Sequence, residues 1–176
     1  MNHADHVSLL RGGIPAAGGV WADFGSGTGA FTLALADLLG PAGEIYSVDQ
    51  DRGALRAQER AILAQFPQTT VHYLNADFTQ PLNLPTLDGL VLANALHFQK
   101  HMRQAEVIQR LKHYLRPGGR LILVEYNVDQ GNLWVPHPLS YQSWEKLALA
   151  CGFTHTQLLD TRPSRFLREI YAAVSW

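Results

Sequence analysis

The chain has 176 residues, of which 47% are hydrophobic and 16% are charged, and its formal net charge is −1. This length fits a single domain, residues 1–176, that buries roughly two-thirds of its unfolded surface. Phosphate neutralisation needs clustered lysine and arginine, so the near-neutral charge makes nucleic acid an unexpected partner. The single cysteine, Cys151, excludes an internal disulfide and a cysteine-based metal site.

The first residues lack the basic start and apolar run of a signal peptide. No stretch approaches the ~20 apolar residues that a membrane-spanning helix needs. The sequence therefore predicts a cytoplasmic protein with no membrane segment. A short polar helix is expected over residues 5–10. The leading segment around it, residues 1–19, carries His3 and His6 and is a candidate lid over a binding site.

Strand-like and helix-like patterns then alternate along the chain. Strands are expected over residues 20–24, 45–48, 71–74, 88–93 and 120–125, and helices over residues 31–39, 52–65, 102–115 and 140–151. Gly40-Pro41 ends the first of these helices, because glycine accepts a left-handed φ and proline cannot continue a helix. Asp51 and Ser140 are placed to cap helices, and Pro117-Gly118 makes the turn into the fifth strand.

Two further strand patterns, residues 154–159 and 170–174, close the chain. The link over residues 161–167 is too short for the crossover helix that a parallel connection needs, so these strands should form an antiparallel hairpin. With the repeated β-α-β order, this predicts a doubly wound α/β fold. Its seven-stranded sheet is expected to be mostly parallel, with an antiparallel C-terminal strand and helices on both faces.

The strongest local signal is Asp23-Phe24-Gly25-Ser26-Gly27-Thr28-Gly29, where the first strand turns into its helix. Glycine is required where backbone passes very close to a ligand or takes a positive φ. In open α/β sheets the ligand crevice forms here, at the carboxyl ends of the strands. Three alternating glycines, with an acid two residues before the first, are far more specific than a single glycine turn.

Acidic residues follow the next two strands. Asp49 comes 24 residues after Gly25 and can accept hydrogen bonds from both hydroxyls of a ribose. The alternative is that Asp49 and Asp51 only start the next helix. After the third strand, Asp77 can accept a hydrogen bond from an adenine amine and Phe78 can pack on the ring, although Asp is also a common turn residue.

Together these segments closely resemble the class I S-adenosylmethionine (SAM)-dependent methyltransferases, which have a Rossmann-like fold. VWADFGSGTGAF resembles their glycine-rich motif, SVDQD the ribose-binding acid and NADF the adenine motif. LDGLVLANALHF resembles their fourth-strand motif, and LRPGGRLILVEY their turn and fifth strand. The resemblance covers residues 20–126, and the predicted terminal hairpin matches the family's reversed last strand.

The resemblance implies SAM as cofactor and a set of residues that bind it. By this resemblance Asp23 lies near the methionine amino group, and Gly25, Ser26, Gly27 and Gly29 line the methionine and ribose path. Asp49 holds the ribose, Asp77 and Phe78 hold adenine, and Asn94 lies near the sulfonium. The adjacent Gln50 is also expected to bind the cofactor. The sequence therefore predicts an enzyme, a SAM-dependent methyltransferase.

Catalytic residues cannot be carried over, because the family has no universal base. His97 and Tyr126, from the ends of the fourth and fifth strands, are the candidates, and packing roles are the alternative for both. Trp134 and His137 lie in the long connection 127–139 and are candidate substrate contacts, with Trp134 covering the sheet as the alternative. No metal site is predicted, because neither HExxH nor paired CxxC spacing is present.

The fourth strand is followed by Asn94-Ala95-Leu96-His97 rather than by N/D-P-P-F/Y, the family motif that accompanies methylation of amino groups on nucleobases. With the near-neutral charge, this favours a small-molecule acceptor, and LANALHF is somewhat similar to the quinone-biosynthesis type. A non-catalytic SAM-binding module, or a subunit completed by a partner such as a second copy in a homodimer, remains an alternative. An NAD-dependent oxidoreductase is disfavoured, because its pattern is GxGxxG whereas Gly29 gives GxGxG.

Overall fold

The computed structural model describes residues 1–164 and 166–176; Arg165, inside the predicted 161–167 link, lies outside the described residues. The α-helices are α1 (His3–Arg11), α2 (Ala30–Leu39), α3 (Arg52–Gln65), α4 (His101–Lys112) and α5 (Tyr141–Ala150), and two 3₁₀ turns are η1 (Gly40–Ala42) and η2 (Leu96–Phe98). The strands are β1 (Gly19–Phe24), β2 (Gly43–Asp49), β3 (Thr70–Asn75), β4 (Leu87–Ala93), β5 (Leu115–Tyr126), β6 (Thr156–Pro163) and β7 (Glu169–Ser175).

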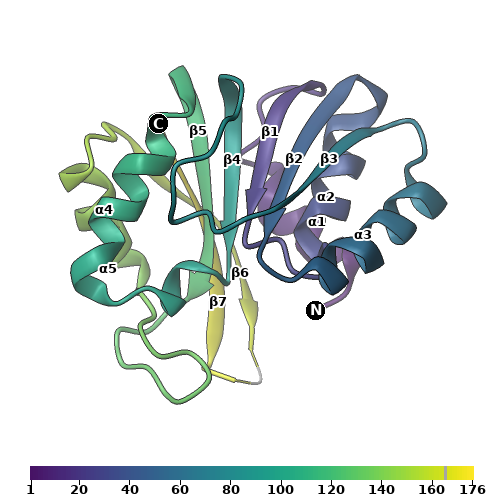
Figure 1. Ribbon diagram of the computed structural model, residues 1–176. Coiled ribbons are helices and arrows are strands. Elements are labelled where there is room, and N and C mark those ends of the chain that lie inside the picture. Colours follow the sequence, from purple (N-terminus) through teal and green to yellow (C-terminus); the bar gives the residue numbers. More distant parts are fainter. Residues whose placement is uncertain (165) are drawn as a thin grey trace.

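All of these strands form one seven-stranded sheet in the order β3-β2-β1-β4-β5-β7-β6. The first five strands along the chain pair in parallel. Strand β7 is antiparallel to both of its neighbours, β5 and β6. Helices α1, α2 and α3 cover one face of the sheet, and α4 and α5 cover the other (Figure 1). The predicted doubly wound fold and its antiparallel terminal hairpin are confirmed.

Each face of the sheet carries its own apolar core. Trp21 of β1 lies with α1, α2 and α3, whereas its neighbours in the strand, Ala22 and Phe24, lie with α4 and α5. Gly89 of β4 leaves room for Trp21, because a Cβ added there would lie 2.3 Å from the indole ring. The Trp21 ring therefore packs directly over Gly89, its pairing partner, and stabilises the contact between β1 and β4 at the centre of the sheet.

The predicted helix caps are present. The Asp51 carboxylate accepts hydrogen bonds from the backbone nitrogens of Gly53 (2.7 Å) and Ala54 (3.1 Å) at the start of α3. The Ser140 hydroxyl accepts one from Ser143 N at the start of α5. Gly40 ends α2 with a φ of +67°. No described helix is long and apolar enough to cross a membrane.

Two predicted boundaries around α4 and β5 are wrong. The helix expected over 102–115 ends at Lys112, and β5 begins at Leu115 instead of Arg120, so Pro117-Gly118 lies inside the strand. The reason is an irregular pairing, in which Leu87 of β4 pairs with Leu115 but Gly89 already pairs with Arg120. The extra residues of β5 are accommodated in this register shift.

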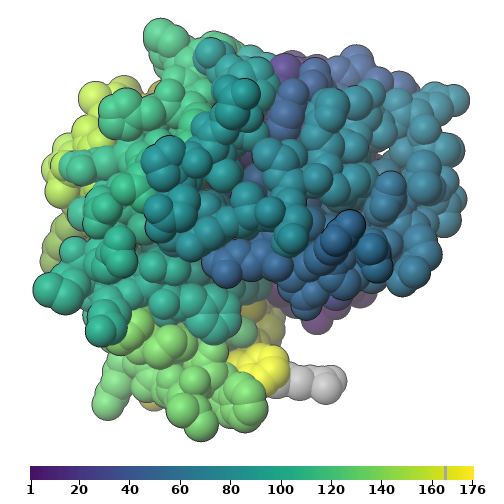
Figure 2. Space-filling model, in the orientation of Figure 1, coloured from purple at the N-terminus to yellow at the C-terminus, as the bar shows by residue number. Residues whose placement is uncertain are grey.

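The crevice of such a sheet lies at the carboxyl ends of its parallel strands, where chain connections diverge around the neighbouring strands β1 and β4. The connection of residues 127–140 reaches the same end of the molecule, beside the start of β7 (Figure 1). In Figure 2 this light-green connection forms the lower part of the surface, next to yellow residues near the end of the chain.

Candidate functional site

The glycine-rich loop between β1 and α2 has a left-handed backbone. The φ angles of Gly25, Gly27 and Gly29 are +72°, +53° and +91°. A Cβ added to Gly25 would lie 2.6 Å from Ala95 Cβ, and one added to Gly29 would lie 2.3 Å from Gln58 Cγ. At Gly27, by contrast, nothing described lies within 4 Å. Two glycines therefore permit close packing, and the middle one faces open space that a ligand can approach.

A chain of polar side chains runs beneath this loop. Asp23 Oδ2 accepts a hydrogen bond from Thr32 Oγ1 (2.6 Å), which in turn accepts one from Gln58 Nε2 (2.9 Å). Ser47 Oγ lies 2.6 Å from Gln58 Oε1 and 2.8 Å from Ser26 Oγ. All five side chains are buried. They connect Asp23, near the end of β1, to helices α2 and α3 and to the glycine-rich loop.

Sequence reasoning missed three members of this chain, Thr32, Ser47 and Gln58. A signal for Gln58 exists, because it shares the buried face of α3 with Leu55 and Ile62. A glutamine on the apolar stripe of a helix must find hydrogen-bond partners inside the protein.

The pKa of Asp23 is raised from a usual 3.8 to about 7, mainly by burial and also by the nearby charge of Asp49, while the hydrogen bond from Thr32 opposes the shift. The Asp23 carboxyl group therefore changes charge near neutral pH. A cation placed beside it would favour the ionised form.

Asp49, at the tip of β2, holds the glycine loop directly. Its Oδ2 accepts a hydrogen bond from Gly27 N (2.7 Å), and its Oδ1 accepts one from Asp51 N (2.8 Å). The helix cap is Asp51, as described above, so Asp49 has a role of its own. It fixes the open middle glycine relative to the end of the strand.

A cavity of about 250 Å³ opens over this loop, and we name it the glycine-loop cavity. Its lining includes five residues predicted to bind a cofactor and three that sequence reasoning missed. The predicted ones are Gly25, Asp49, Gln50, Phe78 and Asn94, and the missed ones are Ala95, Phe98 and Gln99.

The adenine motif is only partly directed at this cavity. Phe78 is in its lining. Asp77 Oδ1 instead accepts hydrogen bonds from Thr79 N (2.8 Å) and Thr79 Oγ1 (2.7 Å), so Asp77 serves as a turn residue. A contact between Asp77 and an adenine amine stays a prediction.

A second cavity, of about 390 Å³, lies between the leading segment and the terminal hairpin, and we name it the hairpin cavity. It is lined by Met1, Asn94, Tyr126, Pro163, Ser164, Phe166 and Ile170. Asn94 thus belongs to both cavities. Its φ is +51°, and among the described residues its buried Oδ1 has no hydrogen-bond partner. Burying an amide oxygen without a hydrogen-bond donor costs free energy, so Asn94 Oδ1 is suited to accept a hydrogen bond from a ligand.

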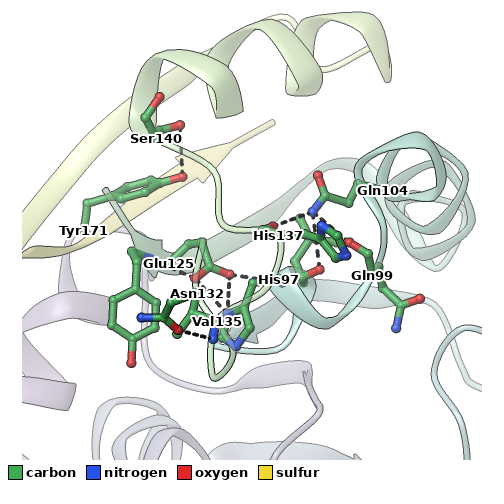
Figure 3. Close-up of polar contacts among 11 residues, drawn as sticks. His97, Gln99, Gln104, Glu125, Asn132, Val135, His137, Ser140 and Tyr171 are labelled. Carbon is green, nitrogen blue, oxygen red and sulfur yellow. Dashed lines mark hydrogen bonds and ion pairs between the residues drawn. The ribbon is translucent and has the colours of Figure 1, made fainter. Parts of the chain in front are cut away.

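The candidate base His97 is buried and contacts the buried carboxylate of Glu125 (Figure 3). His97 Nδ1 lies 2.9 Å and 3.0 Å from the two carboxylate oxygens of Glu125. The imidazole ring packs between Phe98 and Tyr126, with centroid distances of 4.3 Å and 5.8 Å. Glu125 also accepts a hydrogen bond from Tyr126 N (2.8 Å). The carboxylate thereby fixes the ring and leaves Nε2 as its basic nitrogen.

Glu125 was not among the predicted site residues, although the sequence carried a signal for it. It follows the apolar run LILV one residue before the end of β5, at the carboxyl end of the strand, and its side chain is fully buried. A buried carboxylate needs hydrogen-bond partners, and the His97 ring and the backbone nitrogens of His97 and Tyr126 supply them.

The 127–139 connection is held close to His97. Gln104 Nε2 donates hydrogen bonds to Gln99 O (3.1 Å) and His137 O (2.9 Å), and His137 N donates to His97 O (3.0 Å) (Figure 3). The His137 ring lies against His101. Trp134 is 73% exposed, so it does not cover the sheet. Substrate contacts of Trp134 and His137 stay predictions.

The leading segment packs mainly on the outside of the crevice. His3 pairs with Asp37 of α2 at 2.9 Å, and the His6 ring packs on Phe31. Met1 alone of this segment lines the hairpin cavity, and closure of residues 1–19 as a lid stays a prediction. No group of three metal-ligating side chains occurs among residues 1–164 and 166–176.

A family model described as a methyltransferase domain matches residues 22–121. A ubiquinone/menaquinone biosynthesis C-methyltransferase of Pseudomonas aeruginosa is 29% identical over 113 residues, covering 63% of this chain and 43% of that enzyme. A reducing polyketide synthase of a Penicillium species is 24% identical over 163 residues, covering 80% of this chain and 6% of the synthase. The chain therefore spans less than half the length of either relative.

Solved structures of methyltransferases share the fold. The 1,6-didemethyltoxoflavin-N1-methyltransferase of Burkholderia thailandensis, with bound 1,6-didemethyltoxoflavin and S-adenosylhomocysteine, has a TM-score of 0.76 and 17% identity, over 98% of this chain and 77% of that one. Magnesium protoporphyrin IX methyltransferase of Synechocystis, with bound SAM, has a TM-score of 0.72 and 16% identity, over 98% and 77%. The Rossmann-like methyltransferase fold expected from the sequence is confirmed.

The glycine loop yields a prediction about stability. Gly29→Ala should lower the free energy of unfolding by about 2–4 kcal/mol, because the new methyl group meets Gln58 at a left-handed position. The matched variant Gly27→Ala has only the backbone strain and should lose about 1–2 kcal/mol. Urea denaturation measures both values, and equal losses would contradict the packing role given to Gly29.

The pKa of Asp23 yields a second prediction. Because its folded-state pKa (about 7) lies above the usual 3.8, the native state holds a proton that the unfolded chain has released between these pH values. Asp23 therefore lowers the free energy of unfolding increasingly as the pH rises through this window. Asp23→Asn cannot ionise, so its stability relative to the original protein should rise by roughly 1–4 kcal/mol between pH 4 and pH 8. Denaturant titrations at both pH values measure this difference, and a pH-independent difference would refute the buried titration.

Proposed function

Because the chain belongs to the methyltransferase domain family, we propose that it binds SAM and transfers the methyl group to a small molecule. The family match confirms the resemblance that the sequence motifs carry. The observation that supports the activity most strongly is that Asn94 is shared by the glycine-loop cavity and the hairpin cavity. Donor and acceptor sites that meet at one side chain are what a direct transfer between two bound molecules requires.

Residues that line the glycine-loop cavity, together with Gly27 of the loop and Asp23 of β1, which do not line it, fit SAM. Gly27 leaves open space at a left-handed turn, so ligand and backbone can approach closely. Asp49 offers a carboxylate at the tip of β2 for the ribose hydroxyls, and Phe78 offers an aromatic face for adenine. Asp23 can neutralise the methionine ammonium group through its ionised form. Bound SAM supplies a methyl group on a positively charged sulphur, which accepts the bonding electrons when the methyl leaves.

We place the acceptor in the hairpin cavity and assign it to the class of carbon acids, such as 1,3-dicarbonyl compounds or hydroxylated rings. His97 lies three residues after Asn94, and its ring is 5.8 Å from that of Tyr126, which lines this cavity. In the proposed step, His97 Nε2 takes a proton from the acceptor. The resulting enolate carbon then forms the new bond to the methyl group as the bond from methyl to sulphur breaks. Glu125 stabilises the imidazolium that forms.

The relatives support a carbon acceptor. The Pseudomonas enzyme is named as a C-methyltransferase, and the Penicillium relative as a polyketide synthase. The buried His97–Glu125 pair adds to this support, because a carbon nucleophile must lose a proton before or during attack.

The alternatives differ in what an assay would detect. The comparisons give no support to an NAD-dependent oxidoreductase, since the matching family and structures are methyltransferases. A non-catalytic SAM-binding module would bind the cofactor without turnover. A homodimer and a cytoplasmic location stay predictions, and light scattering on the purified chain measures the first.

Asp49→Ala should weaken SAM binding by about 1–3 kcal/mol, the cost of losing charged hydrogen bonds. The matched control is Asp51→Ala, which removes the cap of α3 but touches neither cavity. It should cost about 1 kcal/mol of stability and leave SAM affinity unchanged. Calorimetric titration measures both affinities. Unchanged SAM binding in the Asp49 variant would remove the ribose assignment.

His97→Gln should lower kcat by a factor of about 10²–10⁴, because general base catalysis contributes this much. We would measure methyl transfer to an acetoacetyl thioester by mass spectrometry. Glu125→Gln should also lower kcat, since the neutral amide no longer stabilises a charged imidazole. His113→Gln is the matched control, because His113 is exposed and its ring, among the described residues, is hydrogen-bonded only to Gln109 O of α4.

In His97→Gln and Glu125→Gln, SAM affinity should stay within about twofold of the original value, because neither residue lines the glycine-loop cavity. Undiminished turnover in His97→Gln would rule out the proposed base. If the unaltered protein binds SAM but methylates no carbon acid, the acceptor class is wrong and the cofactor assignment stands.

A further inference from the structure

A cluster of polar side chains, which we name the Arg162 cluster, joins α1 to β6 beside the hairpin cavity. The guanidinium of Arg162 contacts Asp160 Oδ1 through Nη1 (2.7 Å), Ser8 Oγ through Nη2 (2.8 Å) and Asp5 Oδ1 through Nε (3.4 Å). Ser8 Oγ also donates a hydrogen bond to Asp160 Oδ2 (2.8 Å). Arg162 Nη1 also donates a hydrogen bond to Thr161 O (2.8 Å), so one arginine contacts two residues of α1 and two of its own strand.

The cluster is linked to two residues that line the hairpin cavity, Met1 and Pro163. On the side of α1, Asp5 and Asn2 form a capping box, with Asn2 N to Asp5 Oδ2 and Asp5 N to Asn2 Oδ1 both at 2.9 Å. Asn2 directly follows Met1, which lines the cavity. On the other side, Arg162 directly precedes Pro163, which lines the opposite wall. Each wall is therefore connected to the cluster by at most two residue-to-residue links.

The geometry of arginine suits this position. An isolated ion pair at a partly exposed site contributes little to stability, and Arg162 and Asp5 are 28% and 32% exposed. A planar guanidinium contacts its three side-chain partners in fixed directions and so orders them together. A lysine ammonium does not reproduce this geometry. The cluster is therefore suited to fixing a distance rather than to supplying large stability.

We infer that Arg162 is a positioning residue that sets the separation of the two walls of the hairpin cavity and thereby the affinity for the methyl acceptor. The inference rests on the proposed function for the use of this cavity. Arg162 itself lines neither cavity, so it acts through Met1 and Pro163 and does not touch the reacting atoms.

The test compares Arg162→Ala and Arg162→Lys with a matched control, Arg116→Ala. Arg116 pairs with Asp88 at 2.6 Å and lines neither of the two cavities. We would measure KM and kcat for the acetoacetyl thioester, SAM affinity by calorimetry, and amide hydrogen exchange over residues 2–11. Arg162→Ala should raise the acceptor KM about five- to tenfold, with kcat and SAM affinity within about twofold. Exchange over residues 2–11 should become faster in Arg162→Ala. The KM and exchange rates of Arg162→Lys should lie between those of Arg162→Ala and the unaltered protein, and Arg116→Ala should match the unaltered protein.

Two results would overturn the inference. Unchanged exchange over residues 2–11 in Arg162→Ala would show that the cluster does not hold α1, and with it Met1, in place. Faster exchange with an unchanged acceptor KM would show that the wall does not determine acceptor affinity. If the unaltered protein binds SAM but methylates no thioester, the proposed acceptor class fails. The exchange comparison then decides separately whether Arg162 fixes the wall.

Discussion

The backbone between β1 and α2 passes three times through left-handed φ, and this constraint organises the rest of the site. Gly29 must lack a side chain because Gln58 occupies the space where a Cβ would lie. Gln58 bridges Ser47 of β2 and Thr32 of α2, and Thr32 holds the buried Asp23. The turn, the packing of α3 on α2 and the ionisation of the acid are therefore coupled. A change in any one of them alters the surface presented to a cofactor.

Sheet topology then decides which groups meet that surface. Because β4 lies next to β1 and β5 lies next to β4, Asn94 follows β4 at the centre of the crevice. Tyr126 ends β5 one strand further on. The reversed strand β7 and the residues around it close the far side and form a second cavity that shares Asn94 with the first. The buried Glu125 contacts and fixes His97, which follows Asn94 by three residues.

Much of the fold was predictable from the sequence because its signals are local. Apolar runs, the breaker Gly40-Pro41 and the cap Asp51 each act within a few residues, and the short terminal link left no room for a crossover helix. The early start of β5 was not predictable, because it depends on how Leu115 pairs with a different strand across an irregular register. Local patterns carry no information about such pairing.

The site divides in the same way. The glycine loop and Asp49 could be predicted, because their spacing reflects one strand, one turn and one helix. Glu125 was missed because a charged residue that ends a strand usually faces water, whereas here it is fully buried beside His97. Arg162 was missed because its partner Ser8 lies 154 residues away in the chain, and only the completed sheet brings them together.

The central claim, that the glycine-loop cavity is built for SAM, is tested most directly by calorimetric titration of the purified chain with SAM, S-adenosylhomocysteine and NADH. Binding of both sulphur-containing ligands, with no binding of NADH, is the result expected from the loop, Asp49 and the family match. Clear binding of NADH without binding of SAM would contradict the proposed function and leave only the α/β fold.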